Sequence, residues 1–257
     1  TLVKEKEAVA LKLKELGAGV VVTVDCGTSS HEPIEAALNV GLETIVVDHH
    51  VAEAKLPPAI AVINPNRMDD ESGQGELAAV GVAFLLVVAI NRALRDAGWF
   101  LKYQEPDLMK WLDLVALGTI CDVVPLVGLN RALVRQGLKV LGQRTNPGLR
   151  ALSDVAGLSE PPVAYHAGFV LGPRINAGGR IGAPELGSRL LGTDDDAEAQ
   201  DIAQRLDALN LERREIEASV LKAAILDVEQ KGIDTSPIVI AAGEDWHPGV
   251  VGGAHCG

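Results

Sequence analysis

The chain has 257 residues, which is enough for one large domain or for one domain and part of another. Aromatic residues make up only 3% of it, so its core must be built from Ala, Val, Leu and Ile. The longest apolar run, residues 77–90, is too short to span a bilayer, and three cysteines make no disulfide framework. These features exclude membrane-spanning and disulfide-scaffold proteins. They predict a cytoplasmic protein without membrane association.

The net charge of −12 argues against a nucleic-acid binder, but the charge is unevenly distributed. Residues 131–190 carry eight Lys or Arg and only three Asp or Glu, whereas the segments on both sides are acidic. A basic segment between two acidic ones is compatible with a nucleic-acid contact. A solvated helix face would explain it equally well.

The first elements alternate between strand and helix. Residues 20–25 (VVVTVD), 44–48 (TIVVD) and 59–63 (AIAVI) have the β-branched apolar character of buried strands. Residues 31–40 have the composition of a helix, with Ser30 as a possible N-cap. A strand, a helix of about ten residues and a second strand form a βαβ unit, which makes the strands parallel. The predicted fold is therefore α/β, with a doubly wound parallel sheet flanked by helices.

The chain becomes mostly helical after residue 75. Helices are predicted over residues 76–97, 107–118, 130–142, 147–156 and 184–191. Residues 194–231 keep helical periodicity throughout, which predicts one helix roughly 55 Å long. Residues 237–242 are predicted to start a new strand, and a glycine-rich loop is one interpretation of the stretch 172–180 (GPRINAGGR). The cluster Trp99, Phe100 and Tyr103 is expected to cover the core.

Acidic and imidazole side chains stand where apolar runs end. Asp25 closes one predicted strand, and Asp48-His49-His50 closes the next. Asp122 also follows an apolar run. Parallel strands bring their carboxyl ends to one edge, where ligands bind in open α/β sheets. Carboxylates with neutral imidazole suit Mn²⁺ or Mg²⁺, although a turn cap and surface histidines remain an alternative.

Five motifs together resemble those of the bacterial RecJ exonucleases, in the DHH phosphoesterase superfamily. They are "VTVDCGTSSHE", "IVVDHH", "LDLVALGTICDVVPLVGLNR", "LGPRINAGGR" and "WHPGVVG", in the same order and spacing. The resemblance covers residues 7–252. It implies a phosphodiesterase with two divalent cations, Mn²⁺ or Mg²⁺, that degrades single-stranded DNA from the 5′ end in repair and recombination.

The resemblance also implies roles for the residues at the strand ends. Asp25 resembles the carboxylate that bridges both cations, and His49 and Asp122 resemble ligands of one of them. His50 corresponds to a group that contacts the scissile phosphate. Asp48 is expected to orient its neighbours.

A second set of residues is expected to hold nucleic acid. Arg174, Asn176 and Arg180 lie in the glycine-rich motif, where guanidinium groups can grip phosphates. The alternative for these arginines is an ion pair with the acidic long helix. Trp246 and His247 correspond to a Trp-His pair that helps hold nucleic acid in the family.

The resemblance divides the chain into three parts. Residues 1–190 are expected to form the DHH domain, residues 191–232 a connecting helix, and residues 233–257 the beginning of a second α/β domain called DHHA1. The family's first Asp-rich motif is not found before Val20, and the family pattern stops after Gly252. We therefore expect a chain truncated on both sides, with poor Mn²⁺ binding and weak nuclease activity.

Single-stranded DNA is the expected partner of a monomeric protein. The resemblance adds a single-strand-binding protein and a RecQ-type helicase. Two other functions remain open from sequence. One is a different DHH phosphoesterase, such as a pyrophosphatase or a nuclease for short oligonucleotides. The other is a non-catalytic scaffold that keeps the fold.

Overall fold

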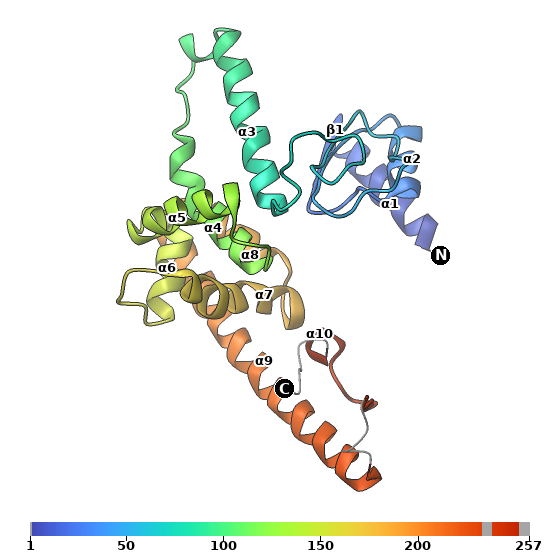
Figure 1. The fold of residues 1–257 in the computed structure, drawn as a ribbon, viewed down its shortest axis with the longest axis vertical. Coiled ribbons are helices and arrows are strands. Elements are labelled where there is room, and N and C mark those ends of the chain that lie inside the picture. Colours follow the sequence, from blue (N-terminus) through green and yellow to red (C-terminus); the bar gives the residue numbers. More distant parts are fainter. Residues whose placement is uncertain (1, 233–237, 252–257) are drawn as a thin grey trace. The chain divides into compact units, whose positions relative to one another are not determined.

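The computed structural model describes residues 2–232 and 238–251, and side chains from residue 9 onward within these ranges (Figure 1). The chain forms two compact units that meet in sequence after Val140. The division at residues 190 and 232 that the family resemblance implies stays a prediction.

A three-stranded parallel sheet organises the first unit. Its strands are β1 (Val20–Val24), β2 (Glu43–Val47) and β3 (Ala61–Ile63), in the order β1-β2-β3. Val24 pairs with Val47, and Val47 pairs with Ile63, so all three strands end in register at one edge. The three predicted strands and their parallel pairing are confirmed.

Helices cover both faces of this sheet. The helices of the unit are α1 (Leu2–Glu15), α2 (His31–Asn39), α3 (Ala79–Asp96), η1 (Trp99–Leu101), η2 (Leu108–Trp111), α4 (Leu112–Cys121) and α5 (Gly128–Gly142). Side chains alternate between the faces of a strand, so Val46 packs with Ile34 of α2 while Val47 packs with Val82 of α3. Apolar side chains on both faces explain why the strands are almost continuously hydrophobic. The prediction of an α/β fold with a parallel sheet flanked by helices is confirmed.

The second unit is helical and is built around one long helix. Its elements are α6 (Pro147–Val155), the π-helical turn η3 (His166–Leu171), α7 (Gly172–Ile181), α8 (Glu185–Gly192), α9 (Asp196–Lys231) and α10 (Pro248–Val251). The Asp195 carboxylate accepts the first amides of α9, and Gly232 ends the helix at φ +64°. Ile202 and Leu206 of α9 are buried. The helix packs against α6, α7 and α8 (Figure 1). The predicted long helix is confirmed.

The glycine-rich stretch 172–180 is helical, so the loop prediction is wrong. It forms α7, which packs against α9. A Cβ on Gly178 would lie 3.0 Å from Leu206 Cδ2, so this glycine permits a close helix contact. The small residues of this stretch therefore serve packing between helices and not turning of the chain.

Two further expectations are corrected. Residues 238–242 form no strand; Pro237 is outside the described residues. Trp99 and Tyr103 do not cover the core, because they are 50% and 55% exposed and stack on each other at 4.6 Å. Among the helices that the structure describes, none combines the length and apolar character needed to cross a membrane.

Candidate metal centre and nucleic-acid contacts

The carboxyl edge of the sheet places the first functional side chains. The Asp25 amide donates to the Val47 carbonyl at 2.9 Å, and the Asp48 amide donates to the Ile63 carbonyl at 3.0 Å. Each bond extends the pattern of the sheet one residue past a strand. Asp25 then takes a left-handed conformation, φ +62°, which aspartate tolerates better than most residues. The chain turns at Asp25 directly beside the residues that follow β2.

Three predicted ligands meet at this edge. His49 Nε2 lies 3.3 Å from Asp25 Oδ1 and 3.5 Å from Asp122 Oδ2. Asp122 does not follow a strand; it caps the carboxyl end of α4. A helix and two strands therefore supply the three side chains. The sequence predicted their convergence, although it did not show that Asp122 comes from a helix end.

The hydrogen bond on the other side of the His49 ring defines its chemistry. His49 Nδ1 is 3.1 Å from the Leu77 carbonyl oxygen, which can only accept. Nδ1 therefore carries a proton, and in the neutral ring Nε2 presents a lone pair to the two carboxylates. With the ring neutral, the three electron-pair donors repel one another unless a cation lies between them. This donor set fits a divalent ion, and the bond to Leu77 holds the imidazole in the ligand tautomer.

His50 lies close to the same cluster. Ligand atoms of Asp25, His49 and His50 all lie within 4.8 Å of one another. The His50 ring is largely exposed, and its Nδ1 is 2.7 Å from Asp48 Oδ1. Asp48 thus fixes the ring, and the opposite nitrogen, Nε2, remains available for a ligand. The hydrogen bond to Asp48 also raises the pKa of His50.

Asp48 is a buried carboxylate held by several donors. It accepts the Thr28 amide at 3.0 Å, the His49 amide at 2.8 Å and the His50 amide at 3.3 Å. Burial alone would raise the pKa of Asp48, but the hydrogen bonds from His50, Thr28 and His49 outweigh it and hold the pKa well below its usual range. Asp122 behaves differently, since burial raises its pKa. Asp48 therefore organises the site as an anion.

Two asparagines that sequence reasoning missed support this edge. Asn64 Nδ2 donates to Thr28 Oγ1 and to the His50 carbonyl, both at 2.8 Å. Asn66 Nδ2 donates to the His49 carbonyl at 2.6 Å. Both residues follow β3, so the signal was available: Asn64-Pro65-Asn66 stands at a third strand end on the same edge.

Asp48→Asn is expected to destabilise the protein by about 1–3 kcal/mol. The two carboxylate oxygens of Asp48 both accept hydrogen bonds, so the amide nitrogen of asparagine would face a donor in either orientation. The measurement is urea unfolding followed by circular dichroism. Asp69→Asn is the matched control, because Asp69 is an exposed partner of Arg67 and solvent screening should make the loss of its charge almost neutral for stability. Equal losses in the two variants would contradict the role of Asp48.

Among the residues predicted to bind nucleic acid, some are paired within the protein and others are exposed to solvent. Arg174 Nε lies 2.7 Å from Asp207 Oδ1 of α9, and its Nη1 donates to the Val170 carbonyl. This is the ion pair with the long helix that the sequence left open as an alternative. Asn176 and Arg180 are exposed on α7. A DNA contact at Arg174 stays a prediction. Of the two arginines, Arg180 is more accessible to a phosphate, because its side chain is exposed and Arg174 is paired with Asp207.

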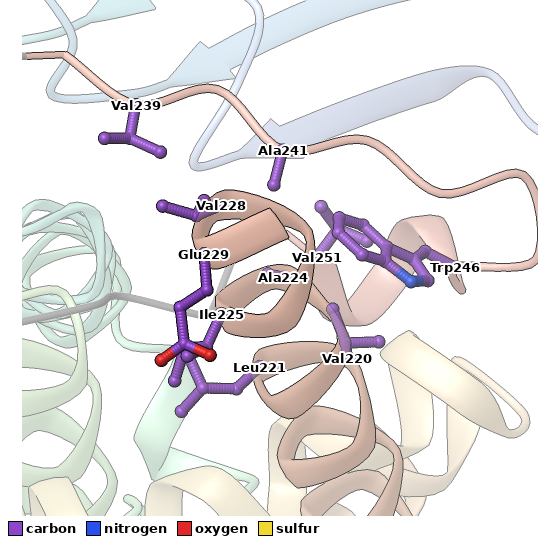
Figure 2. Close-up of a pocket in the computed structure, with 10 residues that line it drawn as sticks. All are labelled: Val220, Leu221, Ala224, Ile225, Val228, Glu229, Val239, Ala241, Trp246 and Val251. Carbon is purple, nitrogen blue, oxygen red and sulfur yellow. The ribbon is translucent and has the colours of Figure 1, made fainter. Parts of the chain in front are cut away.

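Trp246 and His247 lie in different surroundings. His247 is exposed, and its Nδ1 accepts the Gly249 amide at 3.1 Å. Arg180 Nη1 donates to the Gly249 carbonyl, also at 3.1 Å, so Arg180 and His247 share a neighbour. Trp246 instead lines an apolar groove of about 430 Å³ beside the carboxyl half of α9 (Figure 2). The other lining residues are Val220, Leu221, Ala224, Ile225, Val228, Glu229, Val239, Ala241 and Val251.

The fold and the acid–imidazole edge together define a class of protein. Residues 2–119 match the DHH family, N-terminal domain. The matched range contains the sheet and the Asp48-His49-His50 edge.

Comparisons with individual proteins narrow the class. The chain is 45% identical over 243 residues to "Single-stranded-DNA-specific exonuclease RecJ" of Dickeya dadantii (strain 3937), and 44% identical over 243 residues to the protein of that name from Escherichia coli (strain K12). Each alignment covers 92% of this chain and 42% of the relative, so the chain spans less than half the length of these proteins.

Two solved structures have a similar fold. RecJ in complex with Mn²⁺ from Thermus thermophilus matches with a TM-score of 0.80 at 33% identity, over 95% of this chain and 35% of that one. An exonuclease RecJ bound to manganese also matches with a TM-score of 0.80, at 34% identity, over 97% of this chain and 59% of the other.

Proposed function

We propose that this chain carries the metal centre of a single-stranded-DNA-specific exonuclease. The observation that supports this most directly is the convergence of Asp25, His49 and Asp122, with ligand atoms 3.3–3.5 Å apart around one imidazole nitrogen. The named relatives supply the substrate class. The proposed reaction is hydrolysis of phosphodiester bonds from the 5′ end, with Mn²⁺ or Mg²⁺ as the cofactor.

Each residue has a separate task in this proposal. Asp25, His49 and Asp122 hold the first cation, and Asp25 has an exposed carboxylate that can reach a second. Bound cations would activate water and neutralise charge on the phosphate. His50, whose pKa is raised by Asp48, would donate to a phosphate oxygen. Asp48 keeps His50 in the required orientation.

The finer biological assignments rest on resemblance to the relatives. We propose a cytoplasmic, monomeric enzyme of DNA repair and recombination. A single-strand-binding protein and a RecQ-type helicase are the proposed partners.

The alternatives that the sequence left open are less well supported. A pyrophosphatase or short-oligonucleotide nuclease would not need the α7 motif, which is present here with Asn176 and Arg180 exposed. A non-catalytic scaffold would not need to keep Asp25, His49 and Asp122 in contact. Both observations favour a nuclease of long single strands.

A labelled oligonucleotide tests the proposal. A single strand of about 30 nucleotides labelled at its 3′ end should be shortened from the 5′ end by the 257-residue chain with Mn²⁺, slowly but above the rate of a His50→Ala variant. The duplex of the same sequence should stay intact. Hydrolysis of pyrophosphate or dinucleotides without shortening of the long strand would favour the first alternative. No hydrolysis of any of these substrates would favour the scaffold.

Arg180→Ala is expected to weaken single-strand binding and to make it less sensitive to salt. Arg180 is exposed and donates to a backbone carbonyl, which leaves its charge available to a phosphate. Removing one phosphate contact should reduce the slope of log K against log salt by roughly 0.7. The slope is measured by fluorescence anisotropy between about 50 and 200 mM salt, the range over which such effects are large. An unchanged slope would count against the contact.

A further inference from the structure

An exposed aromatic pair stands on the helical run that leads into α7. Residues 164–181 are helical without a break, first through the π-helical turn η3 and then through α7. Tyr165 and Phe169 stack on each other in this run, with ring centroids 5.3 Å apart and an interplanar angle of 23°. Tyr165 is 62% exposed and Phe169 is 73% exposed.

The core does not explain this placement. The chain has only three Trp, two Tyr and three Phe, and its interior is built from aliphatic side chains. Leaving two of these rings in solvent costs the hydrophobic stabilisation that burial would bring. The π-helical turn itself is a rare backbone form that is often found at functional sites. Both features favour a ligand over a packing role.

The surroundings favour an anionic ligand with flat rings. Residues 161–184 contain no Asp or Glu, in a chain with 35 of them, but they contain Arg174 and Arg180. Asn176 and Arg180 are exposed further along the same run. Asn176 follows Phe169 by seven residues, which is about 10 Å along a helix. An aromatic face, an amide and a guanidinium thus follow one another without any acidic side chain between them.

We infer that Tyr165 and Phe169 form a stacking platform for a base of the single-stranded DNA substrate. This inference rests on the proposed function, which supplies a strand with unpaired bases. The outer ring face would stack on one base, and Arg180 would contact the backbone of the same strand. Stacking needs no particular base, because every base has a π face. The platform therefore recognises single strands without reading their sequence.

Paired oligonucleotides separate stacking from charge. The probes are a fluorescent oligo-dT strand of about 20 nucleotides and an abasic strand with the same backbone, measured by anisotropy in EDTA. Phe169→Ala should weaken binding of the dT strand on the order of tenfold and leave the abasic strand unaffected. Phe169→Tyr should keep the affinity, whereas Phe169→Leu, which retains bulk without a ring, should lose it. Tyr165→Ala should behave like Phe169→Ala.

The salt dependence gives a second signature. Stacking releases no counterions, so Phe169→Ala should keep the salt slope of the wild type, in contrast to Arg180→Ala. Leu211→Ala is the control, since Leu211 is an exposed apolar residue on α9 that the platform does not include. The affinity of Leu211→Ala for both strands should match that of the wild type.

The outcomes distinguish this inference from the function on which it rests. If Phe169→Ala binds the dT strand normally, or weakens both strands equally, the platform is refuted while the exonuclease can stand. If the wild type binds neither strand, the platform and the single-strand specificity are both refuted.

Discussion

His49→Ala is expected to weaken Mn²⁺ binding by at least about 100-fold and to remove metal-dependent hydrolysis. His49 Nε2 is in contact with both the Asp25 and the Asp122 carboxylates. Loss of a residue that only orients a ligand already costs roughly 10- to 100-fold in affinity, so loss of the central ligand should cost at least as much. Titration of free Mn²⁺ by electron paramagnetic resonance measures the affinity directly.

A second histidine provides the control for this variant. His31 lies at the start of α2 and has a distant ion pair with Glu53, at 3.8 Å. His31→Ala should leave Mn²⁺ affinity unchanged. Equal affinities for the wild type, His31→Ala and His49→Ala would show that Mn²⁺ binds elsewhere.

Gly148→Ala is expected to cause a large loss of stability in the second unit. A Cβ on Gly148 of α6 would overlap the Leu190 carbonyl oxygen of α8 and would lie 2.7 Å from its carbonyl carbon. These are backbone atoms, so no side-chain rotation relieves the clash and the two helices must separate. We expect a loss of about 3 kcal/mol or more, which lowers the melting temperature by roughly 10 °C.

Gly192→Ala is the matched control for that clash. Gly192 ends α8, and a Cβ there would meet no atom within 4 Å. Its effect should stay within about 1 kcal/mol, because glycine is itself a poor helix former. Thermal unfolding followed by circular dichroism compares the two variants. If the Gly148→Ala and Gly192→Ala proteins have the same melting temperature, the close contact between α6 and α8 is refuted.

The sequence predicted the sheet well because its strands carry apolar side chains on both faces, although Val20, Val22 and Val24 of β1 are about half exposed. Residues 20–25 and 44–48 carry continuous β-branched apolar character, and such runs are typical of parallel strands. The polar residues after them were correspondingly easy to place at one edge. Asp122 was harder to place, since its position depends on how α4 approaches the sheet.

The glycine content of residues 172–180 suggested a loop, although the segment is a helix. Local propensity treats Gly178 as a loop former, whereas the fold uses its missing side chain to bring α7 against Leu206 of α9. The same limitation applies to Arg174, whose ion pair with Asp207 is visible only once the two helices are packed. Contacts between distant segments leave little local signal.

The aromatic pair was missed for a different reason. In the stretch "PPVAYHAGFV", Tyr165 and Phe169 flank the more conspicuous His166, and their spacing of four places neighbouring rings together on a helix. That spacing was readable from the sequence. The exposure of the rings was not, because it depends on which face of the run packs against the rest of the unit.

Anomalous scattering from crystals grown with Mn²⁺ most directly tests whether the edge of the sheet is a metal centre. We predict a manganese peak within bonding distance of the Asp25 carboxylate, His49 Nε2 and the Asp122 carboxylate. A well-ordered edge without a peak, or manganese bound only at other carboxylates, would contradict the proposed centre and the nuclease function that depends on it.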